Sequence, residues 1–197
     1  MHGTCPVMIA LYELGRWNEV PANLQEHLEA FRADPAIECD FVRDGPIIGG
    51  VIAARSGDLQ RAYELRALVG DPLVDVERAT AWQAALELAL DRPESVRQIS
   101  NAKALAGRTY GPLHARVLLE ALIALEDWDE LESFLANARR QVAGLAILGP
   151  CCDRAEGVLA RARGANSAAH AAFERALRGF EELKAATEAK ATRELIR

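Results

Sequence analysis

The sequence predicts an all-α fold, an α-α superhelix (solenoid) of about five stacked helical hairpins. Short turn segments recur at a nearly constant interval, and a second kind of helix boundary follows the same rhythm. Composition agrees, because the chain is rich in Ala, Leu, Glu and Arg, residues that lose little conformational freedom in a helix. We find no alternation of apolar and polar residues long enough to indicate a sheet.

Five six-residue turn segments each lie between two amphipathic stretches. They read GRWNEV at 15–20, GDLQRA at 57–62, DRPESV at 91–96, EDWDEL at 126–131 and GANSAA at 164–169. Their starts are separated by 42, 34, 35 and 38 residues. A period in this range is typical of stacked helical repeats. A single hairpin cannot bury its apolar face, and stacking buries it against the neighbouring hairpin.

The second kind of boundary is a glycine or aspartate followed by proline. The pairs are Gly45-Pro46, Asp71-Pro72, Gly111-Pro112 and Gly149-Pro150. Glycine suits the left-handed residue just past a helix end, and proline suits the first turn of the next helix. We therefore expect each pair to end one hairpin and begin another, and residues 33–45 to form the longest irregular connector.

Helices are predicted from these boundaries and from apolar faces of period 3.6. They span 5–15, 17–32, 46–56, 58–69, 73–90, 93–106, 112–126, 128–142, 150–163 and 166–184, with a last polar helix at 187–196. All belong to one domain, 1–197. Its repeats occupy 1–35, 45–71, 72–107, 111–143 and 149–185, and a C-terminal cap occupies 186–197. The first helix has nothing ahead of it to cover its outer face, so we expect the chain to be an excised part of a longer protein.

The net charge of −6 argues against a general nucleic-acid binder, which needs a basic surface. Residues 1–132 carry 12 basic and 22 acidic groups, whereas residues 133–197 carry 11 basic and 7 acidic groups. This asymmetry has two interpretations. It is ordinary solvated surface, or it is complementarity with a neighbouring domain or with a second copy in a head-to-tail homo-oligomer.

The four cysteines are irregularly spaced in apolar helical context, which does not predict a disulfide framework. Cys151 and Cys152 are neighbours on a helix, so one is expected in the core and one on the surface. No apolar run reaches the roughly 20 residues of a membrane span. No charged-then-apolar leader opens the chain, and a cytoplasmic location is therefore expected.

No catalytic, cofactor-binding or metal-ligating residues are predicted. The phosphate-binding, dinucleotide-binding, hydrolase and zinc-protease motifs are all missing from the sequence. The four histidines form no ligand pair at helical spacing. The acidic residues of 126–130 are expected to cap a helix and complement its dipole. Glu181, Glu182 and Glu188 are interpreted as a solvated face.

The turn pattern resembles the tetratricopeptide repeat, whose second half reads Gly-x-aromatic-x-x-Ala, followed by an aromatic, another Ala and a Pro. The last copy matches best, with Gly164, Ala169, Phe173 and Ala176. The other copies are degenerate: Gly15, Trp17, Val20, Leu24 and His27; Gly57, Ala62, Arg66 and Pro72; and Trp128, Leu131 and Leu135. Such arrays look like the C-terminal regions of bacterial proteins in which helical repeats follow an AAA-type ATPase and accompany a nucleotide cyclase or a DNA-binding domain.

This resemblance implies a non-enzymatic interaction or regulatory module of a bacterial signalling or transcriptional protein. Its partner would be a protein segment or a sister domain in a concave groove, with no direct nucleic acid and no membrane. A small-molecule sensor with a pocket inside the superhelix is the alternative, and a catalytic helical domain is a third possibility. The candidate groove contacts are Arg78, Trp82, His114, Arg116 and Glu120; for Trp82 a place in the core is the other interpretation, and for Arg116 and Glu120 a mutual ion pair.

Overall fold

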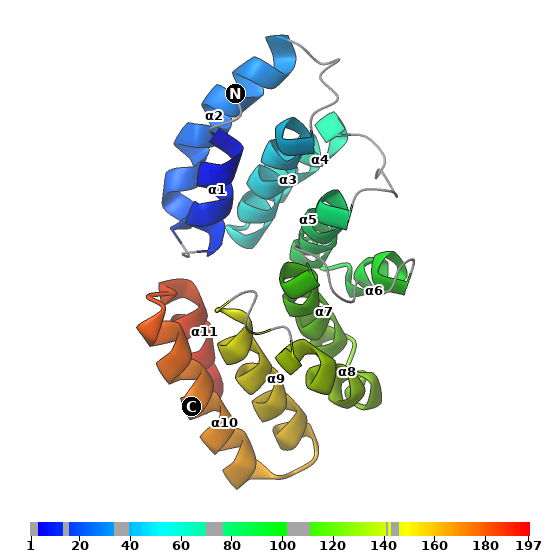
Figure 1. Ribbon diagram of the computed structural model, residues 1–197, viewed down its shortest axis with the longest axis vertical. Coiled ribbons are helices and arrows are strands. Elements are labelled where there is room, and N and C mark those ends of the chain that lie inside the picture. The colour runs from blue at the N-terminus through cyan, green and yellow to red at the C-terminus, as the bar shows by residue number, and fades with distance from the viewer. Residues whose placement is uncertain are drawn as a thin grey trace. The chain divides into compact units, whose positions relative to one another are not determined.

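The computed structural model describes residues 4–13, 16–33, 40–69, 77–101, 111–140, 142 and 146–197. Within these ranges the chain is helical and contains no strand. Two compact units divide it, Met1–Arg92 and Pro93–Arg197, here the N-terminal and C-terminal units. The N-terminal unit holds α1 (Thr4–Glu13), the 3-10 turn η1 (Trp17–Glu19), α2 (Val20–Ala33), α3 (Asp40–Arg55), α4 (Leu59–Val69) and α5 (Glu77–Ala89) (Figure 1). The C-terminal unit holds α6 (Pro93–Asn101), α7 (Gly111–Ala124), α8 (Trp128–Arg140), α9 (Leu148–Ala162), α10 (Asn166–Glu182) and α11 (Ala186–Ile196).

The all-helical prediction is confirmed for the described residues, and the predicted helices correspond to the observed ones in order. The prediction of an irregular connector over 33–45 is wrong from residue 40 onward, because α3 begins at Asp40. Gly45 and Pro46 lie inside that helix and do not start it. A Cβ on Gly45 would lie 2.3 Å from the His27 ring, so this glycine serves a helix crossing. Asp71-Pro72 lies outside the described residues.

Five of the described turns between helices share one backbone device. A residue in the left-handed region ends the first helix, and the next residue donates its N–H to the carbonyl five residues earlier. This is the Schellman arrangement, which satisfies carbonyls left without a partner at a helix end. The left-handed residues are Gly57 (φ 85°), Asp91 (61°), Glu126 (54°), Gly164 (76°) and Lys184 (56°). Their N–H···O distances, from the following residue, are 2.9, 2.9, 3.1, 2.9 and 2.9 Å.

Four of these turns coincide with turn segments predicted from the sequence, and the fifth, at Lys184, lies at the predicted boundary between the helices at 166–184 and 187–196 but is not one of the five segments. The residue that closes each predicted segment is buried: Val20, Ala62, Val96, Leu131 and Ala169. The tetratricopeptide pattern has a small residue at this position, but Val20, Val96 and Leu131 are larger. Small residues let crossing helices approach, and larger ones hold them apart.

In the N-terminal unit, α3 packs against α1, α2, α4 and α5. Two glycines of α3 permit this. A Cβ on Gly49 would lie 2.5 Å from the Leu24 side chain, and one on Gly50 would lie 3.2 Å from that of Leu86. Trp82 is fully buried, and its ring meets the Tyr12 ring edge-on at a centroid distance of 5.0 Å. Of the two interpretations of Trp82, the core placement is the one observed.

In the C-terminal unit, α9 separates two apolar clusters. One face packs with α7 and α8 and holds Cys152, Ala155 and Leu159. The other face packs with α10 and α11, where Cys151 lies among Ile147, Ala176, Phe180, Ala185 and Ala189. Both cysteines are therefore buried, and the expectation that one would face the surface is wrong. The helix is covered on two sides instead of one.

None of the helices that the structure describes combines the length and apolar character needed to cross a lipid bilayer.

Candidate functional site

Four charged side chains from three helices meet inside the C-terminal unit, and we call them the ionic cluster. Arg116 and Glu120 lie one turn apart on α7, Arg154 lies on α9 and Glu188 lies on α11. Each sits on the inward side of its helix. Arg116 is 2% exposed, Glu188 is buried, and the other two are partly buried.

Glu188 is the centre of the ionic cluster. Its Oε1 accepts a hydrogen bond from Arg116 Nη2 at 2.5 Å, and its Oε2 accepts one from Arg154 Nη1 at 2.5 Å. Glu120 Oε1 lies 3.4 Å from Arg116 Nε and 3.4 Å from Arg154 Nη2. Each carboxylate therefore contacts both guanidinium groups, and positive and negative charges alternate around the cluster. Such charge-assisted bonds are the strong kind.

Burial and charge oppose each other at Arg154. Burial works against the charged form, but the neighbouring charges of Glu188 and Glu120 outweigh it and hold the guanidinium pKa above its ordinary value. The guanidinium carbon also lies 5.2 Å from the centre of the Phe180 ring, a cation–π distance. The ionic cluster thus pairs two guanidinium groups with two carboxylates inside the unit.

The two cysteines of α9 flank this region and are poor nucleophiles. Burial raises the pKa of the Cys151 thiol to about 12 and that of Cys152 to about 11. Since the thiolate is the reactive form, both groups are protonated and slow to react at neutral pH. Their chemistry is that of small apolar side chains.

The predicted groove contacts lie in different surroundings. Arg116 and Glu120 join the ionic cluster, which matches the interpretation that they pair with each other. His114 is buried in α7, and burial lowers its pKa to about 4. Trp82 belongs to the core of the N-terminal unit. Arg78 lies in α5, and its side chain is outside the described part of the chain. Trp82, His114 and Arg116 are thus interior side chains.

Arg154 and Glu188 were not predicted, and the interpretation of Glu188 as part of a solvated face is wrong. A signal was present in the sequence. Glu188 shares one face of α11 with Ala185, Ala189 and Thr192, at the i, i+3, i+4 and i+7 spacing of a buried stripe. A charge on such a stripe needs a buried partner. Which helix supplies that partner depends on tertiary contacts between residues 34 and 72 positions apart.

The acidic turn at 126–130 has the capping role expected of it. Asp127 Oδ1 accepts a hydrogen bond from the backbone N–H of Glu130 at 3.2 Å. Arg97 of α6 binds the same turn, with Nη2 2.8 Å from Asp127 Oδ2 and 2.5 Å from Glu130 Oε2. Over the described ranges, no three His, Cys, Asp or Glu side chains come together in a way that could hold a metal ion.

An exposed apolar pair lies on α4 in the N-terminal unit. Leu59 is 50% exposed and Tyr63, one turn later, is 43% exposed. Arg92 lies over the Tyr63 ring, 5.5 Å from its centre, and its Nη2 donates to the Tyr63 hydroxyl at 3.3 Å. Glu87, buried in α5, accepts a hydrogen bond from Arg66 at 2.8 Å and lies 3.5 Å from Arg92. We call Leu59, Tyr63, Arg66 and Arg92 the α4 patch; Glu87 orients its two arginines.

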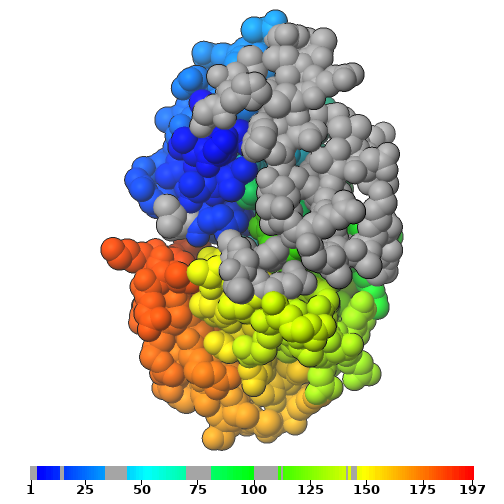
Figure 2. Space-filling view, viewed as in Figure 1, coloured from blue at the N-terminus to red at the C-terminus, as the bar shows by residue number. Residues whose placement is uncertain are grey.

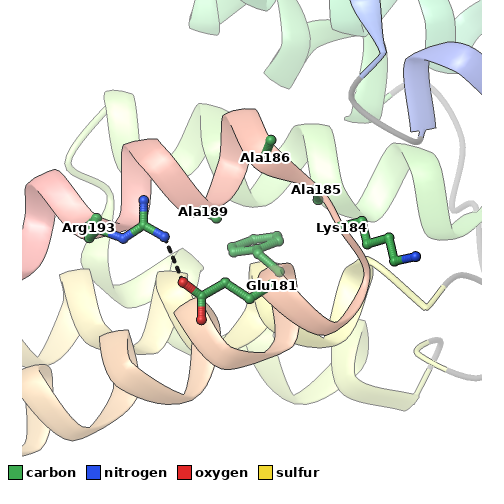
Figure 3. Close-up of a pocket in the computed structure, with 7 residues that line it drawn as sticks. Glu181, Lys184, Ala185, Ala186, Ala189 and Arg193 are labelled. Atoms are coloured by element: carbon green, nitrogen blue, oxygen red, sulfur yellow. Dashed lines mark hydrogen bonds and ion pairs between the residues drawn. The ribbon is translucent and has the colours of Figure 1, made fainter.

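A hollow of about 340 Å³ opens between α10 and α11 at the surface of the C-terminal unit. It is lined by Phe180, Glu181, Lys184, Ala185, Ala186, Ala189 and Arg193. Glu181 and Arg193 face each other across it with a 2.6 Å ion pair, and the Lys184 side chain extends away from them (Figure 3). Helix α10, orange in Figure 2, lies on the surface of the unit.

Comparison of the chain with known protein families, curated proteins and solved structures finds no match.

Proposed function

We propose that the chain is a non-enzymatic interaction and regulatory repeat module of a bacterial multidomain signalling or transcriptional protein. Its ligand in this proposal is a segment or a sister domain of protein. The module acts by geometry, presenting a fixed surface made by successive helical hairpins.

The observation that carries the proposal is the recurrence of one turn device along the chain. Left-handed residues with the same Schellman hydrogen bond recur between successive helices. Alternate helices also pack on each other, α1 on α3, α3 on α5 and α7 on α9. Arrays built in this way present extended surfaces that suit polypeptide ligands.

The α4 patch is the surface that we assign to partner binding. Exposed aromatic and arginine side chains are enriched where proteins bind each other. Tyr63 is already held by Arg92, so little conformational freedom is lost when it is covered. Because Trp82, His114 and Arg116 are interior side chains, they are not available as a contact surface. We therefore assign partner binding to α4 instead.

The test is affinity capture with the full chain followed by a comparison of two double variants. Leu59→Ser with Tyr63→Ser removes the apolar centre of the patch. Gln60→Ser with Glu64→Ser changes two exposed residues on the same helix and is the matched control. We expect a polypeptide that is retained by the unaltered chain and the control and lost by the patch variant.

Retention that is equal for all three proteins would remove the α4 patch from the proposal. A chain that retains no polypeptide but gains thermal stability in a metabolite screen would support the alternative of a small-molecule sensor.

A further inference from the structure

We propose that α11 is a detachable helix whose docking on the C-terminal unit is controlled by Glu188 through Arg116 and Arg154. This inference concerns the ionic cluster and goes beyond the proposed binding role of α4. The inference rests on two observations: α11 buries few apolar side chains, and it buries one charged side chain, Glu188.

The fully buried apolar contribution of α11 to its own docking is small, and its larger apolar residues, Leu195 and Ile196, are only partly buried at its end. Its buried residues are Glu188, Ala189 and Thr192, with Ala185 just before the helix. Alanine side chains bury little apolar area, so they supply little of the hydrophobic driving force. The hollow of about 340 Å³ lies along the same contact and leaves part of the α10–α11 interface open.

The buried polar contribution is concentrated in Glu188. The Arg193–Glu181 ion pair and the hydrogen bond from Arg161 to the Leu195 carbonyl, which also hold α11, are exposed. Helix α11 packs along α10, and its Glu188 carboxylate binds Arg116 of α7 and Arg154 of α9. Removing one partner from a buried ion pair is strongly unfavourable, because the other partner stays buried without its counter-charge. Loss of the Glu188 charge therefore leaves two guanidinium groups, Arg116 and Arg154, with the more distant Glu120 as the remaining carboxylate of the ionic cluster.

The joint before α11 is also strained. Lys184 adopts φ 56° without being glycine, a conformation that disfavours side chains with a Cβ. Release of α11 lets this residue relax. A weak apolar contact, one buried ionic latch beside an exposed Arg193–Glu181 pair, and a strained joint together favour local opening over global unfolding.

The two cysteines of α9 make this opening measurable. Cys151 lies in the apolar cluster to which α11 contributes Ala189 and its preceding residue Ala185, whereas Cys152 lies in the cluster with α7 and α8. Release of α11 uncovers the first and leaves the second covered. While docked, Cys151 has the higher thiol pKa and should be the slower of the two to react. In the unaltered chain, faster labelling of Cys151 than of Cys152 therefore requires that its cover has moved. The Glu188 charge also helps to raise the Cys151 thiol pKa, so the comparison within the unaltered chain is the primary one.

The experiment is alkylation of the full chain at pH 8 with N-ethylmaleimide, with each cysteine resolved by tandem mass spectrometry. In the unaltered chain, Cys151 should react faster than Cys152. Glu188→Gln should raise the Cys151 rate by about tenfold or more and change the Cys152 rate by less than about twofold. The matched control is Glu194→Gln, an exposed residue of the same helix, which should leave both rates unchanged.

Three results would overturn the proposal. One is that Cys151 reacts no faster than Cys152 in the unaltered chain, a comparison that needs no variant. Another is that Glu188→Gln accelerates both cysteines alike, which indicates loosening of the whole unit. The third is that Glu194→Gln has the same effect as Glu188→Gln.

Discussion

At the scale of single residues, the turn between two helices depends on one backbone angle. Gly57 and Gly164 meet this requirement without cost, since a Cβ is what makes positive φ unfavourable. Asp91, Glu126 and Lys184 adopt the same angle with a Cβ present. The chain therefore stores strain at three of its described turns.

Replacing Glu126 with glycine should relieve that strain and raise the free energy of unfolding by about 0.5–1 kcal/mol. The reciprocal change, Gly164→Ala, should lower it by about 1 kcal/mol. No atom lies within 4 Å of the added Cβ, so a steric clash does not contribute. Urea denaturation measures both. Equal midpoints for the two variants would show that the turns are not strained.

His114 makes stability depend on pH. Its pKa is about 4 in the folded chain and about 6.5 when unfolded, because burial disfavours the imidazolium. The unfolded state therefore binds the proton first. The stabilisation that the neutral, buried His114 contributes to the folded state is complete above pH 6.5 and is lost progressively as the pH falls toward 4.

The chain should lose about 2 kcal/mol through this group between pH 7.5 and pH 5. His114→Gln should remove that part of the pH dependence, whereas His170→Gln, at an exposed site, should not. Denaturation at both pH values gives the comparison. An unchanged slope in His114→Gln contradicts the assignment.

At the scale of helices, close crossings depend on glycines that face rigid side chains. Gly157 of α9 is the clearest case in the C-terminal unit, because a Cβ there would lie 2.6 Å from two carbons of the Phe173 ring. Phe173 is itself fully buried on α10 and has no room to withdraw.

Gly157→Ala should destabilise the chain by about 1–3 kcal/mol through overpacking, even though alanine is the better helix former. A double-mutant cycle with Phe173→Leu isolates the cause. In the Phe173→Leu background the same change should cost less, because the smaller side chain leaves space. Thermal unfolding followed by circular dichroism provides the four values, and an identical cost in both backgrounds would falsify the clash.

Helices were predictable from the sequence where capping chemistry marks their ends. Gly57 and Gly164 are visible signals of this kind. The helix boundary at Lys184 was predicted, but its likeness to the other turns was not, because it uses neither glycine nor an aromatic. Helix α3 was predicted to start late because Gly45-Pro46 looks like a boundary. Inside α3 that glycine accommodates the His27 ring, a contact that local pattern does not contain.

The ionic cluster was only half predictable for the same reason. Arg116 and Glu120 are one helical turn apart, and this spacing alone indicates a pair. Arg154 and Glu188 come from helices far along the chain, and their partners follow only from tertiary packing. A charged residue flanked by buried small residues is the local clue that would identify both.

At the scale of the whole molecule, each of the two compact units has its own core. The C-terminal unit buries Leu119, Leu122 and Leu131 around α7 and α8. The N-terminal unit buries Met8, Leu28 and Trp82. In the repeat array that we propose, stability is the sum of local terms and nearest-neighbour contacts.

Leu122→Ala should therefore cost about 2–4 kcal/mol and act locally. Hydrogen exchange resolved by helix should show lower protection in α7, α8 and α9 and unchanged protection in α1 and α2. The matched change in the other unit, Leu28→Ala, should give the opposite pattern. A uniform loss of protection in both variants indicates one cooperative bundle and not an array.

The two-sided burial of α9 also limits how the length of this chain can vary. One extra residue inserted after Cys152 would rotate the remainder of the helix by about 100°. The Arg154 guanidinium would then point to where Ala155 now packs near Leu131 and Leu135. The register of α9 is thus fixed by the two apolar clusters that pack on its opposite faces, and insertions are better tolerated outside this helix.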